Sequence, residues 1–370
     1  MALNSFFKNY KFKSQTLAEI FFQPIVLRRI LGMYLDTTDK VAFSSLDNVA
    51  KKLTQAKSII FIGCGSSYFA ALFAAYVFEE IVGIEAQAEM ADELVTRHFV
   101  FPTQTAVVAI SQSGQTASVL DAVKEIKKRQ AATVIALVNR TGSKLEALAE
   151  ATVLLRAEKE KAIAATKTFT ASLTLLLLLA VFFARLHRRS ETKINLLLRE
   201  LTNLPTQIEE VLEQERNIKK IACNYANQDR FFILGENFNY PIALEAALKF
   251  KEMAYIQAEA VASGEFRHGP MAVIEKKFPC LIIAPPGIAH HTNIALVKLI
   301  KEKGAWPIVL TACGHKNFKP WACEELFLPP AVEMVYPLLA AVALQLLAYH
   351  LGVLRLIDVD HPRYLEKFVR

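Results

Sequence analysis

Cysteine is scarce in this sequence of 370 residues, and its copies lie far apart. The five cysteines form no C-x-x-C pair, and their number is odd. This pattern excludes a disulfide-stapled scaffold and a cysteine-rich zinc site, and it is typical of a reducing, cytoplasmic compartment. His290, His291 and His350 also lack partners at metal-ligand spacing. We therefore expect no metal and no other cofactor.

Charged residues are also few. They make up 21% of the chain, whereas 53% of the residues are hydrophobic. Such a composition excludes intrinsic disorder, and the length predicts about two domains. The net charge of +7 comes from scattered lysines and arginines, and it suits a small anion as well as a nucleic acid. Because residues 1–50 lack a two-helix DNA-reading pattern, we expect no nucleic-acid partner.

A signal peptide and a clear membrane span are missing as well. The first 13 residues alternate aromatic and basic side chains without a continuous apolar core. The stretch 168–184 is strongly apolar, but it is short for a bilayer, contains several hydroxyl residues and stands alone. We expect this stretch to be a buried core helix, and we expect no membrane partner.

The chain repeats itself at a spacing of 172 residues. At this spacing Gly63 coincides with Gly235 and Phe78 with Phe250, without a gap. In each copy short apolar runs alternate with helical patterns, which predicts a doubly wound, three-layer α/β fold with a parallel sheet between helices. The predicted strands are 58–62, 106–110, 133–138, 152–156, 230–234, 279–284, 307–311 and 325–328, and the predicted helices begin at Tyr68, Thr116, Lys144, Ala162, Pro241, Thr292 and Glu333.

The repeat also divides the chain. A polar, helix-prone stretch separates the two copies, and about fifty residues precede the first one. The predicted segments are a helical extension (1–50), a first domain (51–190), a helical connector (191–217), a second domain (218–345) and a C-terminal tail (346–370).

Two loops of the first copy are rich in glycine and hydroxyl groups. They span 63–67 and 111–116, and each leaves a predicted strand and opens a helix. Ligands of such sheets bind beyond these strand ends, where backbone N–H groups and the positive helix end meet. Helix capping explains either loop alone equally well, but the two together predict a site for a phosphate monoester. Neither loop has the dinucleotide or nucleoside-triphosphate pattern.

The second copy lacks this cradle and carries acid–base residues instead. Lys249 and Glu252 lie three residues apart on a predicted helix, so each can shift the proton affinity of the other. His268 adds an imidazole, and this set of groups can move protons between adjacent sugar carbons. From spacing alone, a solvated helix face and a turn histidine explain these residues at least as well.

Six motifs resemble, in the same order, the isomerase part of the glucosamine-6-phosphate synthase family, which is a pair of sugar isomerase (SIS) domains. They are GCGSSY, SQSGQT, EKAIAATKTFT, YPIALEAALKFKEMAYIQAEA, GEFRHGP and LQLLAYHLGVLRLIDVDHPRYLEK. The resemblance covers nearly the whole chain. It implies two tandem SIS domains, a hexose 6-phosphate substrate, ammonia or an amine as the second reactant, and a homodimer with shared active sites.

The resemblance also implies a role for individual residues. Glu252 matches the carboxylate that moves the proton between C1 and C2, and Lys249 is the lysine beside it. His268 matches the ring-opening histidine, which in the family reaches the active site of the neighbouring subunit. Lys367 matches the lysine that forms a Schiff base with the open-chain ketose. The implied substrate-binding residues are Ser66, Ser67, Ser111, Gln112, Ser113, Thr116 and Ile163.

Three features depart from the family pattern. The glutaminase domain is absent from the sequence, which opens Met1-Ala2-Leu3, so we expect free ammonia or a separate glutaminase as a partner. Gln115 stands where the family usually has Glu, and Ala165 where Ser is common. The identity of the sugar beyond a 6-phosphosugar therefore stays open.

We expect an enzyme that interconverts fructose 6-phosphate plus ammonia and glucosamine 6-phosphate, running as a deaminase where free ammonia is low. A synthase subunit fed by a separate glutaminase and a fructosamine-6-phosphate deglycase are alternatives. A non-catalytic sugar-phosphate sensor is an alternative of another class. A sensor would need the phosphate loops, but it has no use for Glu252, His268 and Lys367 together.

Overall fold

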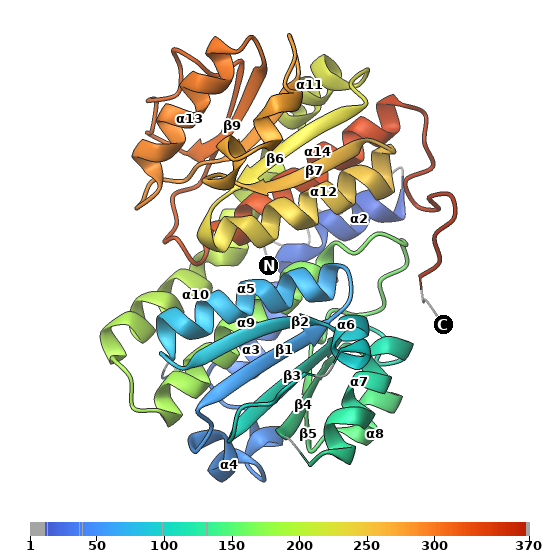
Figure 1. Ribbon diagram of the computed structural model, residues 1–370, viewed down its shortest axis with the longest axis vertical. Helices are drawn as coiled ribbons and strands as arrows, with labels where there is room; N and C mark the ends of the chain where they lie inside the picture. The colour runs from blue at the N-terminus through green and yellow to red at the C-terminus, as the bar shows by residue number, and fades with distance from the viewer. Residues whose placement is uncertain are drawn as a thin grey trace.

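Two parallel sheets, each of five strands, form the centres of the two halves of the molecule (Figure 1). Helices cover both sheets, so the expected α/β fold is confirmed. We expect no signal peptide in the first 13 residues, but of these only Phe12 belongs to the described part of the chain. The computed structural model describes residues 12, 14–36, 38, 40–97, 99–130 and 132–367.

The first sheet has the strand order β2-β1-β3-β4-β5. Strands β1 and β3 are buried along their whole length, as a parallel sheet between two helical layers requires. The sequence prediction missed β2, because this edge strand reads EAQAEM and buries only Ala86. The strands are β1 (Ser58–Gly63), β2 (Glu85–Met90), β3 (Thr105–Ser111), β4 (Ala132–Val138) and β5 (Ala151–Leu154).

The second sheet repeats this arrangement, with the order β10-β9-β8-β6-β7. Its strand β7 was missed for the same reason, since the polar edge sequence QAEAVA buries only two residues. The strands are β6 (Arg230–Gly235), β7 (Gln257–Ala262), β8 (Pro279–Ile283), β9 (Trp306–Ala312) and β10 (Glu324–Leu328).

The helices begin close to the predicted positions, with two differences. Helix α9 begins at Lys167 rather than at Ala162, because the preceding loop bonds to the buried Glu160 carboxylate instead of winding into a helix. Helix α14 begins at Tyr336 rather than at Glu333. The domain helices are α5 (Ser66–Ile81), α6 (Ala91–Thr96), α7 (Ala117–Lys128), α8 (Lys144–Leu148), α9 (Lys167–Leu186), α12 (Tyr240–Ala254), α13 (His290–Glu302) and α14 (Tyr336–Leu354).

A shared layer of helices joins the two halves. The largest apolar core runs from one sheet to the other through α5, α9, α12 and α14, and smaller cores lie on the outer faces of the sheets. Helix α9 contains the apolar stretch 168–184, and α14 is a second helix of comparable hydropathy, so the stretch does not stand alone. In both helices more than four fifths of the most apolar window is buried, as in core helices.

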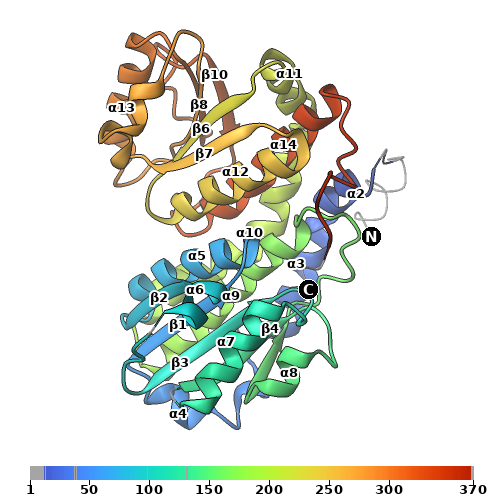
Figure 2. The ribbon, with the colours of Figure 1, turned by 45° about the vertical axis from the view of Figure 1, so that its right-hand side comes forward.

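The remaining helices wrap around this shared layer. The expected boundary between the second domain and the C-terminal tail, after residue 345, falls inside α14. After α14 the chain descends along the side of the molecule to the lower half, where Lys367 contacts the loop that leads into α9 (Figure 2). The remaining helices are α2 (Gln15–Phe21), α3 (Gln23–Tyr34), α4 (Ala50–Thr54), α10 (Glu191–Glu213) and α11 (Glu215–Tyr225), with short 3₁₀ turns at Ser44–Leu46, Asn237–Asn239, Glu265–Arg267 and Pro270–Val273.

Candidate active site

A pocket of about 470 Å³ opens at the carboxyl ends of β1 and β3, where ligands of parallel sheets bind. The pocket is lined by the two hydroxyl-rich loops, Asp92 of α6, the loop that leads into α9, helix α12 of the second half, and the tail. The pocket brings together most of the predicted residues, namely Ser66, Ser67, Gln112, Ser113, Thr116, Ile163, Glu252 and Lys367.

The loop after β3 is held by its own hydroxyl groups. Ser111 Oγ and Thr116 Oγ1 lie 2.9 Å apart, and Ser113 Oγ accepts a hydrogen bond from the Gln115 N–H at 3.1 Å. A hydroxyl that accepts from the backbone keeps its own hydrogen for a ligand. Gly114 has a φ of 62°, and a Cβ there would lie 2.3 Å from Ser143 Oγ, so this turn requires glycine.

Helix α12 brings a buried group of charges to the wall of the pocket. The Lys249 ammonium pairs with Glu252, as the spacing predicts, and lies 3.4 Å from Glu245 Oε1 on the preceding turn. Ser66 of the first half donates a hydrogen bond to Glu245 Oε1 at 3.1 Å. The side chains of Glu245 and Lys249 are almost fully buried, whereas that of Glu252 is 18% exposed. Glu252 is therefore the member of the group that a ligand can reach.

Burial and pairing shift the proton affinities of this group. Burial raises the pKa of Glu245 to about 7; the Glu252 charge adds to this shift, and the Lys249 ammonium opposes it. Burial would lower the pKa of Lys249, but the carboxylates of Glu245 and Glu252 hold that pKa above its usual range. Lys249 thus stays charged near neutral pH, while Glu245 titrates there.

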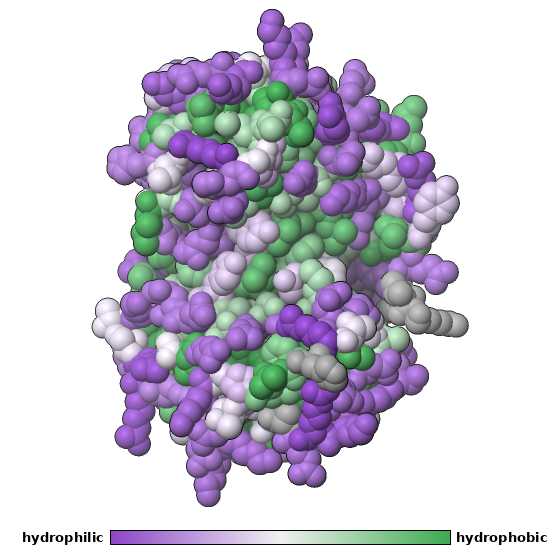
Figure 3. All heavy atoms as spheres, viewed as in Figure 1, coloured by the Kyte–Doolittle hydropathy of each residue, from purple (hydrophilic) through white to green (hydrophobic). Residues whose placement is uncertain are grey.

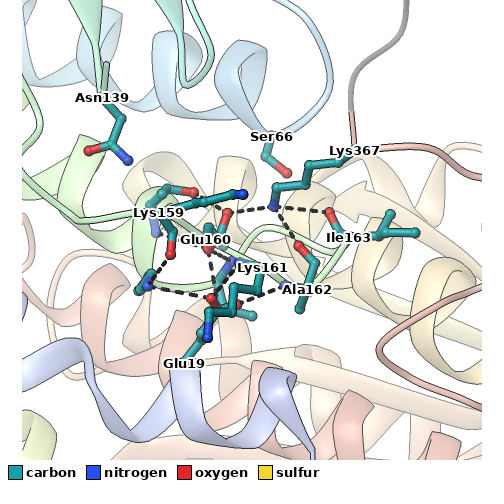
Figure 4. Close-up of polar contacts among 12 residues, drawn as sticks. Glu19, Ser66, Asn139, Lys159, Glu160, Lys161, Ala162, Ile163 and Lys367 are labelled. Carbon is teal, nitrogen blue, oxygen red and sulfur yellow. Dashed lines mark hydrogen bonds and ion pairs between the residues drawn. The ribbon is translucent and has the colours of Figure 1, made fainter. Parts of the chain in front are cut away.

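The tail brings Lys367 back to the first half (Figure 4). Its ammonium donates to Glu160 Oε2 at 2.9 Å, to the Ala162 carbonyl at 2.6 Å and to the Ile163 carbonyl at 3.3 Å. These three acceptors match the three N–H bonds of a lysine ammonium. Lys367 is therefore held at the pocket by all three of these contacts.

Glu160 is the anchor for this lysine. Its side chain is fully buried and also accepts bonds from the Thr166 N–H and the Thr168 hydroxyl. Burial would raise the pKa of Glu160, but the Lys367 ammonium and these hydrogen bonds outweigh it and hold that pKa below the usual value. The carboxylate is therefore charged over the neutral range.

The N-terminal segment holds the loop that leads into α9, which carries Glu160, Ala162 and Ile163. Glu19 of α2 accepts hydrogen bonds from the N–H groups of Lys161 and Ala162, at 2.6 and 3.2 Å. The Asp360 carboxylate of the tail accepts bonds from the N–H groups of Gln15 and Thr16, both at 2.8 Å. The loop that holds Lys367 is thus fixed by segments from both ends of the chain.

His268 does not line this pocket. Its side chain is exposed and lies at a separate hollow of the second half, together with Arg267 and Thr292. Within one chain, the structure therefore brings Glu252 and Lys367 to one pocket but leaves His268 outside it.

Two buried carboxylates of the site escaped the sequence prediction. Glu245 could have been found, because it lies four residues before Lys249 on the same face of a helix. Glu160 gave no such signal, because its partner Lys367 is 207 residues away.

Burial, followed by the Asp92 charge, raises the pKa of Cys64 to about 11, so this pocket cysteine is a thiol rather than a reactive thiolate. Within the described residues, no group of three or more His, Cys, Asp or Glu side chains is placed to hold a metal ion.

Comparison with known proteins agrees with this geometry. The family model for the SIS domain matches residues 52–182 and 224–355, one match for each half. The chain belongs to the SIS domain family. Among curated relatives, the glutamine–fructose-6-phosphate aminotransferase (isomerizing) of Methanosarcina acetivorans is 38% identical over 83% of this chain and 50% of its own length. That of Chlorobaculum tepidum is 33% identical over 97% of this chain and 58% of its own length. This SIS protein thus spans about half the length of these relatives.

Two solved structures share the whole arrangement. The C-terminal domain of glucosamine-fructose-6-phosphate aminotransferase from Francisella tularensis superposes with a TM-score of 0.91 at 27% identity, covering 95% of this chain and 99% of that one. Glucosamine-6-phosphate deaminase from Thermotoga maritima superposes with a TM-score of 0.75 at 25% identity, covering 96% and 99%. The tandem SIS architecture expected from the motifs is therefore confirmed.

Proposed function

We propose that this SIS protein interconverts glucosamine 6-phosphate and fructose 6-phosphate plus ammonia. The observation that carries the proposal is the meeting, in one pocket, of hydroxyl-rich loops, the Glu252–Lys249 pair and Lys367. The names of the relatives, which are aminotransferases and a deaminase of the same sugar phosphates, support it. Hydroxyl and backbone donors of the two loops would hold the 6-phosphate.

In the deaminating direction, the reaction begins on the open-chain aldose. The Glu252 carboxylate removes the C2 proton and returns it to C1, while a second proton passes from the amine nitrogen to the C1 oxygen. The C1 aldehyde and C2 amine thereby become a C1 alcohol and a C2 imine. The Lys367 amine then adds to C2 and ammonia leaves, giving an iminium on the lysine. Water adds to this iminium and releases fructose 6-phosphate and the free lysine. The sum consumes one water and releases one ammonia.

Lys367 must change its state for this chemistry. A lysine attacks carbon only as the free amine, so its ammonium has to lose one proton and leave at least one of its three acceptors. Lys249, which pairs with Glu252, holds that carboxylate in place at the wall of the pocket.

Borohydride trapping tests the proposal. With fructose 6-phosphate and borohydride, we expect the peptide containing Lys367 to gain one sugar-phosphate mass. Lys367→Ala should abolish the adduct, whereas Lys161→Ala should keep it, because the Lys161 side chain points to solvent on the same loop. A protein that binds the sugar phosphate without trapping or isomerising it would instead be a sensor.

The direction of the reaction has a second candidate. The curated relatives are aminotransferases, which favours a synthase that receives ammonia from a separate glutaminase. Ammonia release from glucosamine 6-phosphate, measured against glucosamine 6-phosphate formation from fructose 6-phosphate with ammonium or glutamine, separates the two. Activity with glutamine only after a glutaminase is added would favour the synthase.

We also propose a homodimer in which His268 serves the active site of the other subunit. The exposure of His268 and its place outside the pocket of its own chain support this arrangement. Figure 3 adds an apolar band across the middle of one face, over the region of α5 and α12. Mixed dimers of Glu252→Gln and His268→Ala chains should then recover activity in one of their two sites. If the mixture stays inactive, each site is built from a single chain.

For the compartment we propose the cytoplasm. All five cysteines are free, which suits a reducing environment. The two long apolar helices have their place in the core, and no nucleic-acid or membrane partner is needed for the proposed reaction.

A further inference from the structure

The second SIS domain has a pocket at the position that the candidate active site occupies in the first. It measures about 160 Å³ and lies between the loops that follow β6 and β8. The repeat makes these loops the counterparts of the two hydroxyl-rich loops, because β6 corresponds to β1 and β8 to β3 in the two strand orders. The same fold has therefore kept a cavity at both of its strand-end edges.

Strand register aligns the two edges residue by residue. Ala109 pairs with Ile62 in the first sheet, and Ile282 pairs with Leu234, the counterpart of Ile62, in the second. Gly287 is thereby the counterpart of Gly114, and both have a positive φ, of 145° and 62°. A glycine with positive φ is thus found at the same place in both loops, although the two φ values differ.

The chemistry of the turn is not kept. At this register Pro286 and Ala289 replace Ser113 and Thr116. After β6, the 172-residue repeat replaces Ser66 with Phe238. The hydroxyl donors that suit a phosphate are therefore lost from this edge.

Hydrogen-bond acceptors from other positions line the second-domain pocket instead. The carboxylates of Glu236 and Glu333 line the pocket, and Glu333 Oε1 accepts a bond from the Ile288 N–H at 2.9 Å. Among the described residues that line it, none is Lys, Arg or His. Phosphate would therefore meet two negative groups without a compensating cation, whereas an ammonium group would find partners.

Two buried amides in the wall have unused hydrogen-bonding capacity. Asn239 is 6% exposed and Asn293 is 1% exposed, and both line the pocket. The side-chain oxygen of each is buried without a hydrogen-bond partner. A buried acceptor without a hydrogen bond destabilises the fold, so each of these oxygens calls for a donor.

We propose that this second-domain pocket binds a small hydroxylated primary amine that carries no phosphate. The ammonium group pairs with Glu236 and Glu333, and N–H or hydroxyl donors meet the amides of Asn239 and Asn293. The volume limits the ligand to the size of an amino sugar or less, because it is below the roughly 300 Å³ at which sites for drug-sized ligands begin. This site is distinct from the candidate active-site pocket of the same chain, and Glu236 and Asn293 also line the neighbouring hollow that holds His268. The proposal does not depend on the proposed reaction.

Matched pairs of amine and alcohol test it on the intact protein. Glucosamine against glucose, and ethanolamine against ethylene glycol, differ only in having an ammonium where the partner has a hydroxyl. Isothermal titration at constant ionic strength and saturating fructose 6-phosphate should give one amine site per chain, and the alcohols should bind at least tenfold more weakly. Saturation keeps the active site occupied, so the signal reports the second pocket.

Charge-removing variants locate the site. Glu333→Gln keeps an acceptor for the Ile288 N–H but removes the charge, and Glu236→Gln does the same on the other wall; each should weaken amine binding at least tenfold. Glu259→Gln, an exposed carboxylate on β7 outside the pocket, is the matched control and should leave binding unchanged. Unchanged amine binding in both Glu236→Gln and Glu333→Gln would overturn the assignment. Failure of both amines to bind, or equal binding of amine and alcohol, would overturn it as well. If the amine binds but Lys367 cannot be trapped, the proposed reaction fails and this site stands.

Discussion

The two SIS domains of this protein are built alike and are chemically opposite at their strand ends. Both have five parallel strands and a cavity beside the central strand. The first edge presents Ser113 and Thr116, while the second presents Glu236 and Glu333. The difference teaches that the sheet positions a site but does not choose its ligand, because the choice rests on a few side chains in loops that follow the strands.

The helices that face each other across the domain boundary make the same point. Glu80 of α5 and Glu252 of α12 are counterparts in the repeat. Glu80 forms an ion pair with Lys193 on the surface, with a side chain that is 48% exposed. Glu252 pairs with the buried Lys249 and lines the pocket. One helix carries its glutamate on the surface, and the other places it in the pocket.

Neutralising Glu252 is the change that we expect to have the largest effect. Glu252→Gln should lower kcat about 10²-fold or more, the usual contribution of a positioned general base. It should still form the Lys367 adduct with fructose 6-phosphate, because that step precedes the proton shift. Glu80→Gln, the counterpart variant in the repeat, should leave kcat unchanged when ammonia release from glucosamine 6-phosphate is measured for both proteins. Equal losses in both variants would mean that the two helices do not differ in function.

Removing hydroxyl groups from the first edge should weaken substrate binding. Ser113→Ala or Thr116→Ala each loses a hydrogen bond to a charged group worth about 1.5–3 kcal/mol, so KM should rise roughly ten- to a hundredfold. Thr311→Ala is the control, because this buried hydroxyl lies in β9 of the second domain, outside the pockets described above. An unchanged KM in both first-edge variants would remove the phosphate from these loops.

The buried Glu245 should make stability depend on pH. Because its folded pKa is raised from 4.5 to about 7, the protonated carboxyl favours the fold below pH 4.5, and this contribution is lost as the pH rises to about 7. Glu245→Gln removes that dependence, so the variant should gain stability relative to wild type over this range, by about 3 kcal/mol at most. Urea titrations of both proteins at several pH values measure it. A constant difference between them would mean that Glu245 has an ordinary pKa.

The smallest effects should come from the paired turn glycines. Gly114→Ala and Gly287→Ala both place a side chain at positive φ, which costs about 1–3 kcal/mol. A Cβ at Gly287 would also press on the Glu333 carboxylate, and one at Gly114 on Ser143. We expect Gly114→Ala to raise the KM for the sugar phosphate and Gly287→Ala to leave it unchanged. A rise in both would show that the second edge also touches the substrate.

The fold was largely predictable from the sequence, because buried parallel strands are continuous apolar runs. Strands β1, β3 and β6 lie within one or two residues of the predicted runs. The edge strands β2 and β7 were missed because most of their residues are not buried, so polar side chains interrupt the apolar run that marks a strand.

The site was predictable in part. The hydroxyl loops and the Lys249–Glu252 contact depend on neighbours in sequence, so spacing revealed them. The roles of Lys367 and His268 rested on the family resemblance. The Glu160–Lys367 pair joins residues that only the folded chain brings together, and no local pattern marks it.

The contacts of the C-terminal tail with the N-terminal segment and with Glu160 have a consequence for the order of folding during synthesis. A ribosome releases the N-terminal segment first, and domains generally fold as they emerge. The first SIS domain can then form its phosphate loops while the tail is still to be made, but Asp360 and Lys367 reach Thr16 and Glu160 only after hundreds of residues have followed. In the proposed reaction, the loops that would bind the phosphate are therefore made before the lysine that would react with the sugar, and Lys367 emerges after all helices of the shared core.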